Sequence, residues 1–165
     1  MSFGPYCYSN NGFSSRAVAS SYSPQAGEVI FADVPTSQQL TAAFSGYAAQ
    51  AAAQAAVAAG NAALAAGLTV NSTSTPALDG VFAVDEQSQS DINAVSTYIV
   101  VNGTFPQGQA TTYWADKSGS IHLFPSVSVF QAFATAVANY VDAIEDYQNS
   151  GGTAGSLPAT MVTII

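Results

Sequence analysis

The sequence predicts an α+β fold, and three features of the chain lead to this prediction. An alanine-rich stretch has the composition of a long helix, and two later segments carry apolar residues at helical spacing. Short runs of β-branched and aromatic residues lie between turn residues, which is typical of strands. We expect an extended N-terminal arm over residues 1–35, a long helix over 36–67, a small α+β domain over 68–148 and an apolar tail over 149–165.

Composition excludes several classes of partner. The chain has 165 residues, enough for a core that needs no disulfide or metal. Only 7% of them are charged, against about 25% in typical proteins, and the net charge is -8. Arg16 and Lys117 are the two basic residues. Since nucleic acid and anionic lipid both attract proteins through many basic side chains, we expect no nucleic-acid partner and no binding to anionic membranes.

The N-terminal arm is rich in glycine, proline, serine and asparagine, with aromatic residues among them. Disordered segments are usually poor in aromatic residues, so we expect the arm to be ordered by contact with the chain or with a partner. Its one strand-like stretch is residues 28–32. The N-terminus lacks the basic and apolar regions of a secretory signal. The alanine run over 42–68 is interrupted by amide residues, so we expect no membrane span.

A single long helix is predicted over residues 36–67. Thr36 or Ser37 can cap its N-terminus, and Gly67 is placed as a left-handed C-terminal stop. Bulky apolar residues occur only near its two ends, with alanine between them. Alanine buries little area, so an isolated helix of this kind would be marginal and is expected to pack against a partner.

Residues spaced by three and four along this helix form a seam like that of a coiled coil with small and polar layers. A coiled coil would make the chain a homo-oligomer, and a trimer is the favoured form. The alternative is that the amide side chains of the seam simply face water. The predicted oligomer interface consists of Leu40, Phe44, Tyr47, Gln54, Val57, Asn61 and Leu64.

The small domain is expected to begin with a polar loop over 68–80 and a short strand over 81–84. A helix follows over about 86–100, with Asp85 as its N-cap and an apolar stripe at helical spacing.

A hairpin is then predicted from strands at 112–115 and 120–124, because a four-residue turn containing glycine separates them. An amphipathic helix from 126 to about 147 follows, and the apolar end of the tail over 149–165 is expected to pair as a strand. The predicted domain core consists of Trp114, Phe130, Phe133, Val137, Tyr140 and Ile144.

The sequence contains few residues of the types that commonly take part in catalysis or bind metals. His122 is the single histidine and lies in the predicted hairpin, where a structural role is expected. A zinc site needs about four nitrogen or sulfur ligands, and this chain offers only His122 and Cys7. A lone cysteine also forms no internal disulfide. We therefore expect no enzymatic activity and no cofactor.

Two groups of acidic residues could supply oxygen ligands to calcium. The alternative is that one group caps a helix and the other forms a solvated face of the last helix. A glycan-cleaving enzyme would also use paired acids, but nothing in the sequence indicates a cleft between them. The two groups are Asp85, Glu86 and Asp91, and Asp142, Glu145 and Asp146.

The order of features over about residues 58–148 resembles a known family. An alanine-rich helix ending in glycine is followed by a strand, the Asp-x-x-Ser-Gln segment from Asp85, a hairpin containing Trp114 and a long amphipathic helix. This order is similar to a domain of unknown function found C-terminally in bacteriophage tail-fibre and tail-fibre-assembly proteins. Such domains usually carry lysine and arginine in the first helix, whereas this chain carries none there.

The resemblance implies a non-enzymatic structural component of a bacteriophage tail or tail fibre, located in the virion and bound to other tail or fibre proteins. The alternative it implies is a fibre-assembly chaperone that acts in the host cytoplasm and is not retained in the virion. It supplies no catalytic residues.

Overall fold

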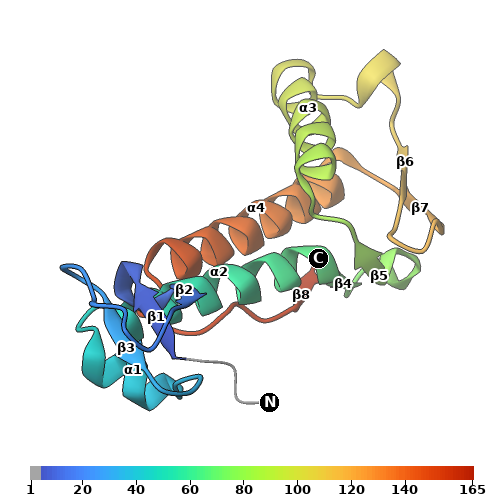
Figure 1. Ribbon diagram of the computed structural model, residues 1–165. Helices are drawn as coiled ribbons and strands as arrows, with labels where there is room; N and C mark the ends of the chain where they lie inside the picture. Colours follow the sequence, from blue (N-terminus) through green and yellow to red (C-terminus); the bar gives the residue numbers. More distant parts are fainter. Residues whose placement is uncertain (1–4) are drawn as a thin grey trace. The chain divides into compact units, whose positions relative to one another are not determined.

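The computed structural model describes residues 5–165, and this part of the chain is mixed α+β, with four α-helices and several small sheets (Figure 1). The predicted fold class is confirmed at this level. The chain divides into two compact units, residues 1–55 and 56–165, and each is described by itself.

The N-terminal unit contains an antiparallel sheet of three strands in the order β2-β1-β3. The expectation of an extended arm over residues 1–35 is therefore wrong for residues 5–35, although the strand-like stretch at 28–32 does form β3, and residues 1–4 lie outside the described part of the chain. The turn between β1 and β2 is the 3-10 helix η1, in which two asparagines adopt positive φ, a conformation that asparagine tolerates better than most residues. The elements are β1 (Tyr6–Ser9), η1 (Asn10–Gly12), β2 (Ser14–Ala17) and β3 (Val29–Phe31).

Aromatic side chains order this segment within its own unit. The rings of Tyr8 and Phe31 meet edge to face on paired strands, with their centroids 5.6 Å apart. Phe13 stacks on Tyr47 with a centroid distance of 5.0 Å. The aromatic residues that argued against a free tail thus contact one another, and this requires the chain to turn back on itself.

The single helix predicted over 36–67 is instead two helices, α1 (Ser37–Ala43) and α2 (Tyr47–Ala66). Phe44 ends α1 in an extended conformation, and its side chain is buried in the N-terminal unit. Burial of a phenylalanine stabilises by roughly 1.5–3 kcal/mol, which is enough to offset the few hydrogen bonds lost at a helix break. Ser45 and Gly46 follow, and both are weaker helix formers than alanine.

Both predicted helix ends are confirmed. Thr36 accepts a hydrogen bond from the backbone N–H of Gln39, whose side chain accepts one from the Thr36 backbone in return. At the other end, Gly67 follows α2 with a φ of +87°, the left-handed conformation that glycine adopts at little cost.

The C-terminal unit contains a three-stranded sheet in the order β5-β4-β8, in which β4 pairs antiparallel with β5 and parallel with β8. The polar loop predicted over 68–80 is wrong in its first part, because β4 (Leu68–Ser72) is a strand whose alternate residues are buried. The predicted pairing of the C-terminal tail is confirmed by β8 (Met161–Ile164). Between them lie η2 (Pro76–Leu78) and β5 (Gly80–Phe82).

The remaining elements follow the predictions closely. Asp85 caps α3 by accepting from the backbone N–H of Ser88 at 2.9 Å, and Gly103 ends that helix with a φ of +71°. The predicted hairpin is formed by β6 and β7. The elements are α3 (Glu86–Asn102), η3 (Pro106–Gly108), β6 (Thr112–Ala115), β7 (Ile121–Phe124) and α4 (Val127–Asn149).

Helix α4 is the centre of the core of this unit. Eight of its residues are buried. Four phenylalanine rings from β5, β7 and α4 pack together with centroid distances of 4.9–6.4 Å. By length and hydropathy α4 is the one helix among the described residues that could cross a membrane, and buried core helices share both properties. These rings belong to Phe82, Phe124, Phe130 and Phe133.

Candidate functional site: the β6–β7 hairpin

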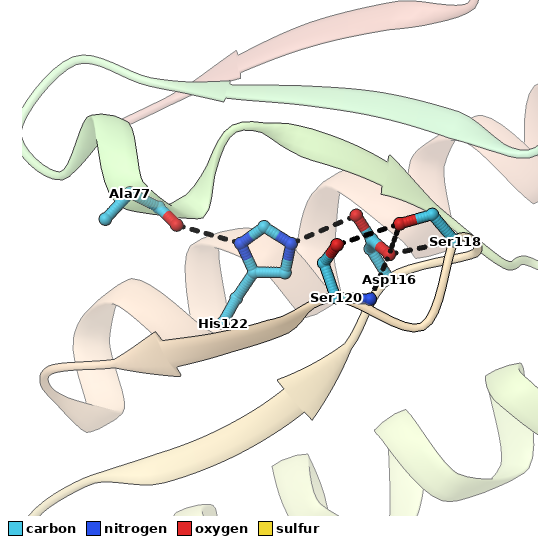
Figure 2. Close-up of polar contacts among 5 residues, drawn as sticks. All are labelled: Ala77, Asp116, Ser118, Ser120 and His122. Carbon is cyan, nitrogen blue, oxygen red and sulfur yellow. Dashed lines mark hydrogen bonds and ion pairs between the residues drawn. The ribbon is translucent and has the colours of Figure 1, made fainter.

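A buried ionisable pair lies beneath the β6–β7 hairpin (Figure 2). His122 Nε2 is 3.1 Å from Asp116 Oδ2, and His122 Nδ1 is 2.8 Å from the carbonyl oxygen of Ala77 in η2. A carbonyl oxygen only accepts, so Nδ1 must carry a proton, and Nε2 faces a carboxylate that also accepts. Both contacts are satisfied at once only by the doubly protonated imidazolium.

Asp116 is held as a carboxylate by the turn that it begins. Its Oδ1 accepts from the hydroxyl of Ser118 at 2.7 Å and from the backbone N–H groups of Ser118 and Ser120 at 2.8 and 2.9 Å. These bonds, with the Ser118 hydroxyl first and His122 next, lower the pKa of Asp116 to about 2. The aspartate is therefore charged at every pH well above 2, including the range in which the histidine titrates.

Gly80 in β5 lets the strand approach this pair closely. A Cβ atom at this position would lie 3.1 Å from His122 Nε2 and 3.2 Å from Asp116 Oδ2, tighter than an ordinary contact. The pair therefore connects the hairpin to η2 and packs against β5. A two-stranded hairpin is marginal in water by itself, so these contacts, and the packing of Trp114 on Phe130 at 5.5 Å, hold it in place.

The geometry of this cluster does not suit nucleophilic catalysis. A serine nucleophile needs its hydroxyl hydrogen-bonded to a neutral histidine nitrogen. Here the Ser118 hydroxyl donates to Asp116, and both nitrogens of His122 contact other acceptors. The cluster connects the hairpin to η2 and so stabilises its position.

The opposite side of the hairpin, its outer face, is apolar and exposed. Tyr113 is 66% exposed, Ile121 65% and Leu123 41%. Tyr113 pairs directly with Leu123 across the strands, and Ala115 with Ile121, so the four side chains form one continuous face. β6 also has no hydrogen-bonded neighbour besides β7 among the described strands. An exposed apolar face of this kind is typical of an interaction surface.

The His122–Asp116 pair makes the stability of the hairpin depend on pH. Burial opposes the charged form of His122, but the bonds to Ala77 and Asp116 outweigh it and raise the pKa of His122 above 6.5. Because the pKa of His122 is raised in the folded protein, its contribution to stability is complete below pH 6.5 and is lost as the pH rises through the folded pKa. Because the pKa of Asp116 is lowered, its contribution is complete above pH 3.8 and is lost as the pH falls through the folded pKa. The pair is therefore most favourable between about pH 4 and 6.5.

We expect the melting temperature of the wild type to exceed that of His122→Gln most at pH 5, and the difference to shrink steadily toward pH 9. Glutamine keeps a polar side chain but cannot titrate. Thermal unfolding followed by circular dichroism at each pH measures this difference. A difference that is constant from pH 5 to pH 9 would show that His122 is not charged in the folded protein.

A second polar cluster lies in the N-terminal unit. Arg16 pairs with Glu28 at 2.6 Å, and the Tyr22 hydroxyl donates to the same carboxylate at 2.6 Å. Cys7 is buried beside them, and burial is the main cause that raises the pKa of its thiol. A thiol with a raised pKa is a poor nucleophile, so this cluster is structural.

The residues of the predicted oligomer seam lie in different surroundings. Leu40 and Phe44 are buried in the N-terminal unit, and Tyr47 stacks on Phe13 there. Leu64 packs against the core of the C-terminal unit. The other three, Gln54, Val57 and Asn61, are exposed. The Oδ1 atom of Asn61 accepts a hydrogen bond from Gln148 of α4 at 3.0 Å.

The structure also places the predicted core and the acidic residues. Phe130, Phe133, Val137, Tyr140 and Ile144 are buried, and Trp114 is half-buried against them. All six acidic residues of the two groups are exposed. Across the described residues, no three histidine, cysteine or acidic side chains come together as a metal site would require.

Two features of the site were not predicted from the sequence. One is the partnership of Asp116 with His122, which the hairpin register could have indicated, because Trp114 pairs with His122 and residue 116 lies two positions further along the same face. The other is the outer face. The sequence pattern that could have indicated it is an apolar residue at every second position in both strands of the hairpin. Tyr113, Ile121 and Leu123 alternate with residues that face the core.

Comparisons with known proteins identify no relative. No family model, no curated protein and no solved structure matches the chain. A function for this chain is therefore inferred from its site and its sequence pattern.

Proposed function

We propose that this protein is a non-enzymatic structural component of a bacteriophage tail or tail fibre, in which it attaches fibre parts to one another. The observation that carries the proposal is the outer face of the β6–β7 hairpin, exposed and apolar while its other side is fastened to the core. The resemblance of residues 58–148 to a tail-fibre-associated domain and the low charge of the chain support it.

The outer face has the composition of an interface centre. Such centres are poor in charged residues and rich in aromatic ones, and Tyr113 with Ile121 and Leu123 fits this composition. The contacts of His122 and Trp114 beneath them fix the strands before any partner arrives. A face that is rigid in advance loses little entropy on binding, which favours a stable attachment.

Self-association is a second part of the proposal. The seam residues left exposed on α2 include Gln54 and Val57, and a homotrimer would form through them. Such a contact would be smaller than a coiled coil over the whole of residues 36–67, because the other apolar seam residues are buried or half-buried within their own units.

Replacing Tyr113, Ile121 and Leu123 together by threonine tests the attachment. Threonine keeps the strand preference, and exposed substitutions change stability by only about 0.5 kcal/mol each, so the variant should fold. We expect particles assembled with this variant to carry less than about a tenth of the normal amount of fibre, a loss of about 1.4 kcal/mol or more. Quantitative gel analysis of purified particles measures it.

A matched control replaces three exposed residues of α3 by threonine, namely Tyr98, Val100 and Val101. It removes a similar amount of exposed apolar surface from a different element and should assemble normally. Normal assembly of the hairpin variant would contradict the proposed role of the outer face.

A further inference from the structure

The ring of His122 contacts two segments of the chain that differ in how far they are joined to it. His122 of β7 is 8% exposed, and its Nδ1 atom is 2.8 Å from the carbonyl oxygen of Ala77 in η2 (Figure 2). Its Nε2 atom is 3.1 Å from Asp116, which lies in the turn of the same hairpin. The first contact therefore joins the hairpin to a separate element, whereas the second lies within the hairpin.

A neutral ring cannot make both of these contacts. Neutral imidazole carries a single N–H, so its other nitrogen presents a lone pair to whatever it faces. Both neighbours, the carbonyl oxygen of Ala77 and the carboxylate of Asp116, only accept hydrogen bonds. A lone pair that faces an acceptor in a buried site is unfavourable, so the two atoms must separate until water can enter between them.

The remaining proton is expected on Nε2, the nitrogen that faces Asp116. A hydrogen bond to an ionised acceptor is roughly twice as strong as one to a neutral acceptor. Asp116 stays ionised because the hydroxyl of Ser118 and the backbone N–H groups of Ser118 and Ser120 donate to its other oxygen. The carbonyl oxygen of Ala77 is neutral. Deprotonation should therefore leave a lone pair on Nδ1, facing Ala77.

The other charged groups near the hairpin face away from His122. Asp79, at the end of η2, accepts from the backbone of β4 at 2.7 Å. The ammonium group of Lys117 donates to a carbonyl oxygen at the end of α2. Strands β5 and β6 carry no charged residue, and the acidic residues of α4 lie in its second half. Among the described residues, Asp116 is thus the charged partner of the ring.

We propose that His122 is a pH-dependent switch for the contact between β7 and η2, in which loss of a proton releases Ala77 while the bond to Asp116 stays. Leu78 of η2 is completely buried, so we expect it to remain in the core and the movement to be local to Ala77. Burial lowers the pKa of His122, but the bonds to Ala77 and Asp116 raise it more, which places the release above pH 6.5. This switch does not depend on the tail-fibre proposal.

Nuclear magnetic resonance of the isotope-labelled full chain tests the switch. Proton–nitrogen correlations within the imidazole ring distinguish the imidazolium from each of the two neutral tautomers. We expect the imidazolium at pH 5 and the tautomer with its proton on Nε2 at pH 9. The carbonyl carbon of Ala77 should shift with the same midpoint, above pH 6.5. A neutral ring with its proton on Nδ1, or a ring whose protonation is constant from pH 5 to pH 9, would overturn the proposal.

Asp116→Asn is the matched variant in which the switch should fail. The amide keeps an oxygen for the donors of Ser118 and Ser120 and can direct its N–H toward Nε2 of His122. Neutral His122 can then accept at Nε2 and donate from Nδ1 to Ala77, so both contacts persist at high pH. We expect the Nδ1–H tautomer at pH 9, a lower midpoint, and less than half of the wild-type shift at Ala77.

A variant that still places its proton on Nε2 at pH 9 and shifts Ala77 as the wild type does would contradict the proposed role of the carboxylate. The amide spectrum of Asp116→Asn shows whether this variant is folded. If it is not folded, the tautomer of the wild type at pH 9 decides by itself, because the proposal requires the proton on Nε2.

Discussion

Replacing Phe133 with alanine is expected to lower the free energy of unfolding by about 3–5 kcal/mol. Phe133 is completely buried, and its ring lies 4.9–5.8 Å from the rings of Phe82, Phe124 and Phe130. These neighbours belong to three different elements, so they cannot close around the cavity without moving a strand or a helix. Since small domains are stable by only about 5–15 kcal/mol, the loss is a large fraction of the total.

Urea denaturation followed by circular dichroism measures this loss. Val101→Ala is the control, because this valine of α3 is exposed and should change the stability by no more than about 0.5 kcal/mol. If Phe133→Ala changes the free energy of unfolding as little as the control does, the aromatic cluster is not the core of the C-terminal unit.

Replacing Gly67 with alanine is expected to destabilise the protein by more than the roughly 1–2 kcal/mol that a left-handed conformation alone costs a residue with a Cβ. A Cβ atom here would lie 2.6 Å from the carbonyl oxygen of Phe82 and 3.2 Å from Val81. The 2.6 Å contact is with backbone, so β4 and β5 would have to separate at the end where α2 enters the sheet.

Gly103→Ala isolates the steric part of this effect. Gly103 also has a positive φ, but a Cβ atom there would meet nothing within 4 Å. Chemical denaturation of both variants gives the difference between them, which we expect to be at least about 1 kcal/mol, the usual lower limit of forcing atoms into a packed site. Equal losses in the two variants would mean that β5 does not pass close to Gly67.

The sequence predicts the C-terminal unit better than the N-terminal one, for a physical reason. Helix α4 has an apolar stripe at helical spacing, α3 has an aspartate cap, and the hairpin has a turn with Gly119 at positive φ. These are local signals, and the structure follows them. The pairing of the C-terminal tail could be predicted in part, because an apolar chain end is expected to pair with another strand. That this strand is β4 could not be predicted, because it is not a local property of the sequence.

The errors arise where tertiary contacts outweigh local preference. An alanine-rich sequence favours one helix, yet burial of Phe44 beside Gly12 ends α1. The sheet of the N-terminal unit depends on the pairing of β1 with β3, which are about twenty residues apart. Strand β4 has a weak local signal, because its polar residues mask the alternation of the buried Leu68 and Val70.

The candidate site was only partly predictable. Its hairpin and the structural role of His122 follow from spacing and turn residues. The charge of His122 does not, because it depends on the carbonyl oxygen of Ala77, which lies 45 positions away in the sequence. The exposure of Tyr113 likewise depends on which face of the hairpin meets α4.

Quantitative mass spectrometry of purified phage particles tests most directly the proposal that this protein is a permanent part of the particle of a phage that encodes it. We predict that the chain is present at a fixed ratio to the tail proteins, with a copy number divisible by three if the homotrimer forms. Its presence in the infected-cell lysate but not in washed particles would contradict the claim and would favour the assembly chaperone.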